Sequence, residues 1–506
     1  MTVLEARGVG VDWAMVSGGR EGRAALQDAS FVLTPGFYGL VGANGAGKTT
    51  LLRVLAGELA AHQGSVAVRP PDATVVFCPQ GVDELSDDVR ALSSMHDGLA
   101  AELKGRLMLE ADELDRWPTL SPGERKRWQI AAALVREPDV LLLDEPTNHL
   151  DVGARARLTS ALRRFRGIGV VVSHDRQLLE ELPRAILRVH DGTVALHAGR
   201  YSIARAAWEE ARREVEDSHA RAKARVHAVE RRLDAVRRTQ EATSRGVATR
   251  SRMKGPRDHD AKSMGSKVVA RWADARAGRT VHVVRDELAK ARAAVPTIER
   301  DRTLGGKIFA TYERAPNAVL FHLDVPELRA GTHLVLRDVR VTIGREDRVR
   351  ITGENGAGKT TLLRALLTSQ KADDRLCYLP QELAKEEVMT LMTHLRGASG
   401  EERGRVLSVF SALGSDPERI LGRSSSAAAT LSPGEARKLA LAFGLGRLAR
   451  ALVLDEPTNH LDLPTIERLE QALEGYPGAV VLVTHDDAFA AAVTSRTLHV
   501  EHGLVT

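Results

Sequence analysis

Apolar side chains form two regular seams between residues 200 and 305. The first seam comprises Trp208, Ala211, Val215, Ala222, Val226, Val229, Leu233 and Val236. The second comprises Ala277, Val281, Val284, Leu288, Ala291 and Val295. Spacings of four and three residues alternate in the second seam and in the later part of the first, which indicates one face of a helix. The two seams predict an antiparallel helical hairpin, whose first helix, near 203–240, extends about 55 Å at roughly 1.5 Å per residue.

Short, continuous apolar runs mark the rest of the chain. "FYGLV" and "VRIT" each precede a glycine-rich loop, and the helix candidates "TTLLRVLAGEL" and "TTLLRALLT" follow the loops. "VLLLDEP" and "ALVLDEP" are strand candidates that end in two acids. Carboxylates at the carboxyl end of a buried strand are typical of α/β sheets that bind a ligand at that edge. The sequence therefore predicts α/β domains on both sides of the hairpin.

The two glycine-rich loops fit the pattern G-x-x-x-x-G-K-[ST]. In such a loop, backbone N–H groups face phosphate oxygens, and the positive end of the following helix adds to the attraction. The lysine reaches the β- and γ-phosphates, and the Thr hydroxyl ligates Mg²⁺. The candidate nucleotide-binding residues are Gly42, Asn44, Gly45, Gly47, Lys48, Thr49 and Thr50 in the first loop, and Gly353, Asn355, Gly356, Gly358, Lys359, Thr360 and Thr361 in the second.

Further motifs repeat at a fixed distance. "LSPGE", "LDEPTNHLD" and a "SHD" or "THD" triplet each occur twice, and every second copy lies 311 residues after the first, as Lys359 does after Lys48. Gln80 and Gln381 are 301 residues apart. A fixed separation of this kind indicates two copies of one domain. The predicted domains are 1–199, 200–305 and 306–506, and the length of 506 residues suits three domains.

Composition and charge indicate the cellular setting and the kinds of partner that this protein can have. The two cysteines, Cys78 and Cys377, are too few for a disulfide framework or a zinc site, and we expect both to be small core residues in a reducing cytoplasm. No apolar run approaches 18 residues, and the first residues lack the features of a signal peptide, so we expect no membrane association. The net charge of +5 is compatible with a nucleic-acid partner.

The ordered motifs resemble those of ATP-binding-cassette (ABC) domains over roughly 1–200 and 306–506. Two cassettes on one chain, with a charged linker and the wording "LDEPTNHLD", resemble the ABC-F proteins. This resemblance implies an α/β fold of two tandem P-loop ABC domains joined by an antiparallel α-helical hairpin linker. It also implies an ATPase that uses ATP and Mg²⁺.

The resemblance assigns roles to individual residues. The implied Mg²⁺ ligands are Thr49, Gln80, Asp144, Thr360, Gln381 and Asp455. The implied catalytic residues are Glu145 and Glu456, which polarise the attacking water, and His174 and His485, which contact the γ-phosphate. Phosphoryl transfer needs mainly positioning and charge stabilisation from the protein.

The "LSPGE" signature explains why two cassettes are needed. Ser121 and Ser432 are candidate helix N-caps, and a Glu three residues later predicts a capping box. In ABC proteins this helix end, including Gly123 and Gly434, faces the γ-phosphate held by the opposite cassette. The resemblance therefore implies a monomer whose cassettes pair head to tail, with both ATP sites shared.

The residue that stacks on adenine is less evident. Trp13 is the candidate in the first cassette, with a packed core tryptophan as the alternative. In the second cassette the nearby candidates are Phe321 and His322.

The interruption between the seams, 244–271, contains several glycines and a proline, so we expect it to be irregular. Between Arg245 and Arg279 there are ten Lys or Arg and three Asp or Glu, a surplus of seven positive charges. Such a tip favours contacts with a phosphate backbone, and the candidate RNA-contacting residues are Arg250, Arg252, Lys254 and Arg257. In ABC-F proteins this hairpin reaches toward tRNA and the peptidyl-transferase centre of the ribosome. The alternative is a solvated, flexible turn.

Three functions fit these features. The first is a ribosome-binding factor that contacts rRNA and tRNA, either as a translation factor or in antibiotic protection. The second is the ATPase subunit of a transporter with separate membrane proteins, and the third is a DNA-associated ATPase. The basic hairpin favours the first over the second. Zinc motifs and very long coiled coils, which some DNA-associated ATPases carry, are not found in this sequence.

Overall fold

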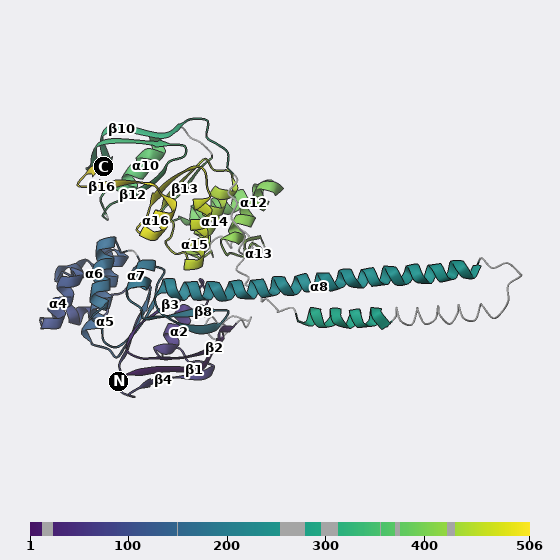
Figure 1. Ribbon diagram of the computed structural model, residues 1–506. Helices are drawn as coiled ribbons and strands as arrows, with labels where there is room; N and C mark the ends of the chain where they lie inside the picture. Colours follow the sequence, from purple (N-terminus) through teal and green to yellow (C-terminus); the bar gives the residue numbers. More distant parts are fainter. Residues whose placement is uncertain are drawn as a thin grey trace, which may run out of the picture. The chain divides into compact units, whose positions relative to one another are not determined.

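The computed structural model describes residues 1–12, 24–148, 150–252, 279–294, 312–354, 356–369, 375–421 and 431–506 (Figure 1). The chain divides into two compact units. The larger comprises Met1–Ala204 and Arg302–Thr506, and the smaller comprises Arg205–Asp301.

A nine-stranded sheet with the order β4-β1-β2-β9-β8-β3-β7-β6-β5 organises the first cassette. Its strands are β1 (Val3–Asp12), β2 (Ala24–Leu33), β3 (Gly36–Val41), β4 (Gln63–Arg69), β5 (Val75–Cys78), β6 (Val140–Asp144), β7 (Ile168–Val172), β8 (Ala185–His190) and β9 (Thr193–Ala198). Strands β5, β6, β7, β3 and β8 pair in parallel, whereas β1 pairs antiparallel with β2 and β4. All residues of β6 and β7 are buried, because helices cover both faces of a parallel sheet.

The helices of the first cassette begin at side-chain caps, except α2, which follows Gly47 and has none. They are α2 (Lys48–Leu55), α3 (Asp87–Ser94), α4 (Gly98–Leu107), the 3₁₀ segment η1 (Ala111–Thr119), α5 (Pro122–Val135), α6 (Val152–Leu162) and α7 (Arg176–Glu181). Asp151 and Asp175 each accept a hydrogen bond from a backbone N–H in the first turn of α6 and α7. These caps satisfy N–H groups that the helix leaves unpaired.

The second cassette contains a six-stranded sheet, β13-β14-β15-β12-β16-β17, and the hairpin β10-β11. Its strands are β10 (Val319–Ala330), β11 (His333–Gly344), β12 (Arg348–Thr352), β13 (Leu376–Leu379), β14 (Ala451–Asp455), β15 (Ala479–Val483), β16 (Arg496–Glu501) and β17 (Leu504–Val505). Its helices are α10 (Lys359–Ser369), α11 (Lys385–Gly397), α12 (Gly400–Ala412), α13 (Glu418–Leu421), α14 (Pro433–Gly446), α15 (Leu463–Glu474) and α16 (Asp487–Val493). The predicted fold class, with two ABC domains of α/β type, is confirmed.

Parallel pairing brings the motif-bearing loops to one edge of each sheet. In the first cassette β7 pairs in parallel with both β3, which leads into the glycine-rich loop, and β6, which ends at Asp144. In the second cassette β15 does the same for β12 and β14. Because the carboxyl ends of parallel strands lie at the same edge, this topology positions each candidate site.

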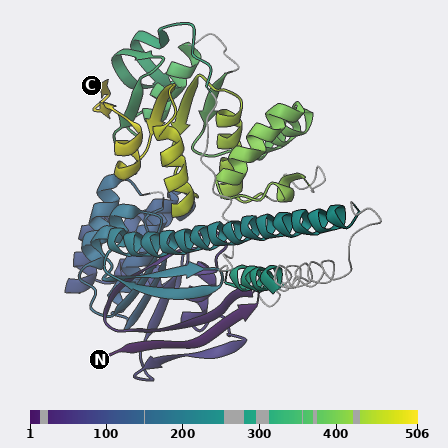
Figure 2. The ribbon, with the colours of Figure 1, turned by 45° about the vertical axis from the view of Figure 1, so that its right-hand side comes forward.

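The smaller unit contains most of α8 (Tyr201–Arg252) and the helical residues 279–293 (Figures 1 and 2). Val229, Leu233, Val284 and Leu288 form a buried cluster from the two predicted seams. Glu230 pairs with Arg292 at 2.7 Å, and Arg232 pairs with Glu287 at 3.2 Å. These pairings run in opposite directions along the two segments, as an antiparallel arrangement requires.

Helix α8 is longer than the sequence predicts. The interruption was expected to begin at Ser244, but α8 runs through Gly246 to Arg252. One glycine costs a helix only about 1 kcal/mol relative to alanine, which the surrounding helix-forming residues can offset. Residues 253–278 lie outside the described residues, as do the side chains of Arg250 and Arg252.

Cys78 is a core residue, as predicted, since it ends β5 and is 1% exposed. Cys377 is only partly buried and packs against the core of the second cassette, where a Cβ on Gly444 would clash with its sulfur. Burial raises the pKa of both thiols to about 12, so they stay neutral and poorly nucleophilic at pH 8.

We therefore expect both cysteines to resist iodoacetamide at pH 8 in the native protein and to react rapidly in guanidinium chloride. Mass spectrometry of the alkylated protein measures both rates, and the denatured sample is the control. Alkylation of the native protein at a rate close to that of the denatured protein would contradict this packing.

Candidate functional sites

Each glycine-rich loop curls around its own lysine. Lys48 Nζ donates hydrogen bonds to the carbonyls of Gly42 and Ala43 at 2.8 and 3.0 Å. Lys359 Nζ contacts the carbonyls of Gly353 and Glu354 at 2.8 and 2.9 Å. The described residues of the two loops therefore make the same lysine contacts, and a loop of this kind can turn backbone N–H groups toward an anion.

Left-handed glycines end both loops. Gly47 has φ of 103° and Gly358 has φ of 105°, which side chains rarely tolerate. A Cβ on Gly47 would also lie 2.7 Å from the carbonyl oxygen of Ala25. A larger residue at either position would therefore be strained, and at position 47 it would also clash with the backbone of β2.

Carboxylates of β6 and β14 lie beside the loops. Thr49 Oγ1 donates a 2.8 Å hydrogen bond to Asp144 Oδ2. Burial raises the pKa of Asp144 and of Asp455, because it disfavours the charged form. Within the described part of the chain, the buried Oδ2 of Asp455 has no hydrogen-bond partner. A hydroxyl, carboxylates and an unsatisfied buried oxygen are donors that suit Mg²⁺.

A glutamate and a histidine face each other in each site. His174 Nε2 lies 3.0 Å from Glu145 Oε1, and His485 Nε2 lies 3.5 Å from Glu456 Oε1. Burial raises the pKa of Glu456 to about 7 and lowers the pKa of His485 to about 4. A carboxylate with a pKa near neutrality suits a general base.

The structure reveals a buried cation in each copy that the motif analysis missed. Lys126 Nζ donates hydrogen bonds to the carbonyls of Pro79, Gln80 and Asp144, the last at 3.1 Å. Arg437 donates in the same way to the carbonyls of Gln381, Asp455 and Glu456. Each cation links the helix that follows the "LSPGE" signature (α5 or α14) to the backbone beside Gln80 or Gln381. It also links that helix to the end of β6 or β14.

This pair could have been found in the sequence. Arg437 lies 311 residues after Lys126, so both copies carry a cation at the same position of the signature helix. A positive charge that both copies of a helix carry on the apolar face indicates a buried cation with a structural role, since such a group needs hydrogen-bond partners.

The predicted capping boxes are confirmed. Ser121 Oγ accepts a hydrogen bond from the N–H of Glu124, whose carboxylate accepts one from the N–H of Ser121. Ser432 and Glu435 form the same pair of bonds at the start of α14. Pro122 and Pro433 occupy the first helical turn, where the missing N–H would have no partner.

Residues of the two cassettes meet around the first glycine-rich loop. Asn44 N donates to Asp462 Oδ2 at 2.7 Å, and Asn44 Nδ2 donates to the His460 carbonyl at 3.1 Å. A Cβ on Gly434 would lie 3.5 Å from Asn44 Nδ2. The signature of the second cassette therefore lies beside the loop of the first. The matching residue of the second loop, Asn355, lies outside the described residues.

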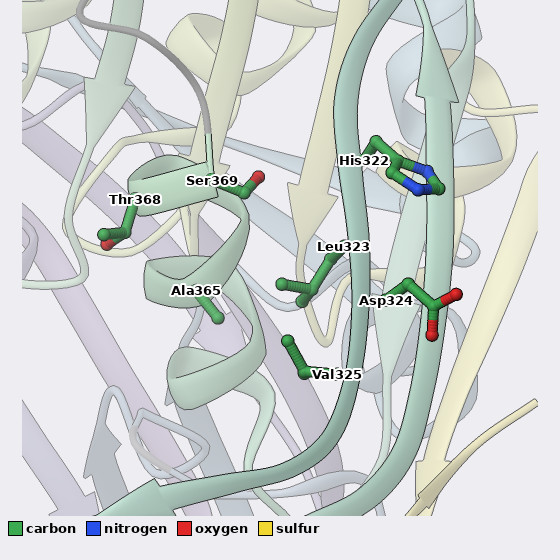
Figure 3. Close-up of a pocket in the computed structure, with 7 residues that line it drawn as sticks. All are labelled: His322, Leu323, Asp324, Val325, Ala365, Thr368 and Ser369. Atoms are coloured by element: carbon green, nitrogen blue, oxygen red, sulfur yellow. The ribbon is translucent and has the colours of Figure 1, made fainter.

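The adenine-stacking candidates are placed differently from the sequence prediction. Phe321 is completely buried in the core, so it cannot stack on a base. His322 contacts Thr342 and lines an open hollow with Thr368 and Ser369, at the end of α10 remote from its lysine (Figure 3). Both candidates are therefore wrong, because they lie at the wrong end of β10. Trp13 lies outside the described residues.

Comparison with known proteins agrees with this geometry. The ABC transporter family model matches residues 26–148 and 336–459. The chain is 32% identical to the tylosin resistance ATP-binding protein TlrC of Streptomyces fradiae, over 96% of each chain. The chain belongs to the ABC-F family of ATPases. It binds ATP and hydrolyses it.

Further relatives support the family and the fold. The ribosome protection protein VmlR of Bacillus subtilis (strain 168) is 28% identical, over 91% of this chain and 81% of its own. A solved structure of an RNase-L Inhibitor has a TM-score of 0.53 at 20% identity, covers 92% of this chain and 84% of its own, and shows the fold alone. In the described residues of this ABC-F protein, no helix combines the length and hydropathy needed to cross a membrane.

Proposed function

We propose that this ABC-F ATPase binds the ribosome and acts through its interdomain segment on tRNA or the peptidyl-transferase centre. It would do so as a translation factor or by protecting the ribosome from an antibiotic. The observation that carries the proposal is the likeness to TlrC and VmlR along almost the whole chain, because their names state drug resistance and ribosome protection. The positive surplus between Arg245 and Arg279 supports contact with RNA phosphates.

The geometry of each site supports the roles that we propose for its residues. Thr49 and Asp144, or Thr360 and Asp455, would hold Mg²⁺, and Gln80 or Gln381 would sense it. When bound, the ion supplies positive charge to the β- and γ-phosphates. Glu145 and Glu456 would orient the attacking water, while His174 and His485 would hold the γ-phosphate region. The N-terminus of the signature helix would complete the site from the opposite cassette.

The proposed organisation is a cytoplasmic monomer with intramolecular cassette pairing. Its domains would be 1–199, 200–305 and 306–506. The contacts of Asn44 with His460 and Asp462 support pairing within one chain.

Charge reversal at the hairpin tip tests the ribosomal role. The variant carries Arg250→Glu, Arg252→Glu, Lys254→Glu and Arg257→Glu. We expect ATP binding by the free protein to be unchanged, because the four positions lie in the linker, outside both proposed cassettes. Ribosome affinity should fall and its dependence on salt should flatten, because phosphate attraction becomes repulsion. Cosedimentation with ribosomes over a salt series, and cell-free translation with and without drugs of the peptidyl-transferase centre, measure both effects.

The matched control reverses four exposed cations elsewhere on α8, namely Arg213, Lys223, Arg225 and Arg231. It changes the net charge equally and should weaken ribosome binding less. Equal ribosome affinity, salt dependence and translation for wild type and the tip variant would show that the tip is only a solvated turn. Recovery of the wild type with membranes and not with ribosomes would favour a transporter subunit.

A further inference from the structure

The contacts between the cassettes are not symmetric. Arg176 pairs with Glu470 at 2.6 Å, and the Tyr201 hydroxyl donates to Glu467 at 2.9 Å. The duplicated position of Arg176 is Asp487, which pairs inside its own cassette with Arg350 at 2.6 Å. An asymmetric interface means that the two ATP sites need not work alike.

Arg155 is an asymmetric residue that contacts the backbone of a candidate catalytic group, His485. It lies in the first turn of α6, where its Nε donates to the Leu150 carbonyl at 3.0 Å. Its Nη1 lies 3.4 Å from the backbone carbonyl of His485, in the second cassette, and 3.7 Å from Asp175. The guanidinium thus joins the loop that carries His485 to two points of the first cassette.

The duplicated residue of the second cassette cannot make the reciprocal contact with the His174 loop, because it is not a cation. The position 311 residues after Arg155 is Ile466, which is 1% exposed in the core of the second cassette. An isoleucine cannot donate a hydrogen bond to the His174 loop. Only the site built on Lys359, Glu456 and His485 therefore receives a cation from across the interface through this position. We call it the second site, and the site with Lys48, Glu145 and His174 the first.

We infer that Arg155 is a positioning residue for ATP hydrolysis at the second site, where it holds the His485 backbone in place from the opposite cassette. The planar guanidinium can hold three acceptors at fixed angles, which a flexible ammonium does less well. A loop held in this way keeps His485 beside Glu456, as catalysis by positioning requires. This inference rests on the proposed roles of those two residues.

The test isolates each site in the full-length chain. Glu145→Gln leaves hydrolysis to the second site, and Glu456→Gln leaves it to the first. Arg155→Ile, which installs the residue of the duplicated position, should lower kcat roughly tenfold or more in the Glu145→Gln background. KM for ATP should change little, since the described contacts of Arg155 are with Leu150, Asp175 and His485 and not with residues of the second nucleotide loop. In the Glu456→Gln background the loss should be several-fold smaller, and Arg155→Lys should restore part of the activity of the second site.

Two controls distinguish a failure of the inference about Arg155 from a failure of the proposed catalytic roles. Tyr201→Phe removes the hydrogen bond to Glu467 across the interface and changes no residue of either histidine loop, so it should affect both backgrounds alike. An equal loss in both backgrounds, a larger loss in the Glu456→Gln background, or no loss in either would overturn the inference about Arg155. Persistent hydrolysis in the Glu145→Gln, Glu456→Gln double variant would instead overturn the proposed catalytic roles.

Discussion

Replacing Glu145 and Glu456 with glutamine is expected to stop ATP hydrolysis while the protein still binds ATP. The amide preserves the shape of each carboxylate but cannot accept a proton from the attacking water. General-base catalysis contributes roughly 10²–10⁴-fold to a rate, so phosphate release should fall by at least about a hundredfold. If the ribosome is the partner, the variant should accumulate on ribosomes in the presence of ATP. Without hydrolysis, the protein cannot leave its ATP-bound state.

Phosphate release and ribosome sedimentation through sucrose measure the two parts of this prediction. The matched control is Glu58→Gln with Glu386→Gln, which changes one exposed acid in each cassette and should behave as wild type. A hydrolysis-deficient variant that stays in the supernatant with ATP as completely as without it would argue against the ribosomal proposal. A variant that still hydrolyses ATP at the wild-type rate would contradict the catalytic assignment alone.

Pairing one loop variant with two different signature variants is expected to give two different ATP stoichiometries. Lys48→Ala and Ser432→Arg damage the same site if that site is shared between cassettes, so the pair should retain about one bound ATP. Lys48→Ala and Ser121→Arg damage different sites and should retain almost none. The expectation follows from Asn44, which contacts residues of the second cassette beside Gly434. The effects of two variants on ATP binding do not add when both act on one site, whereas they add when the variants act on independent sites.

Equilibrium dialysis with ATP, in the Glu145→Gln, Glu456→Gln background, counts the bound nucleotides. Each serine variant also loses a helix cap, which costs about 1 kcal/mol, so thermal unfolding of the single variants is the control. The opposite order of stoichiometries would mean that each cassette completes its own site.

Features that depend on neighbours in the chain could be predicted from the sequence alone. The glycine-rich loops, the capping boxes at Ser121 and Ser432, and the hairpin seams are set by contacts within a few residues. The fixed separation of 311 residues between the two loops and between the two capping boxes then predicts two cassettes. The residue roles at the sites remain predictions, since geometry shows where Glu145 or His485 lies and not what it does.

Some sequence predictions failed where distant contacts decide the outcome. Phe321 and His322 alternate along β10, but only the packing of that strand on α10 decides that one is buried and both lie far from Lys359. Glycine disfavours a helix, so the sequence around Gly246 predicts an interruption, yet α8 continues past this residue. Local preferences of about 1 kcal/mol are readily overridden by the rest of a long helix.

Local spacing and repetition were enough to predict the fold class, the two nucleotide loops and the order of motifs around each of them. The partners that distant residues meet became known from the three-dimensional structure. It placed Lys126 and Arg437 against the backbone of the acidic strands, and it directed Arg155 across the interface while its counterpart Ile466 stays in the core. The physical reason is that a buried or bridging cation is specified by the acceptors around it, and those come from segments far apart in the chain.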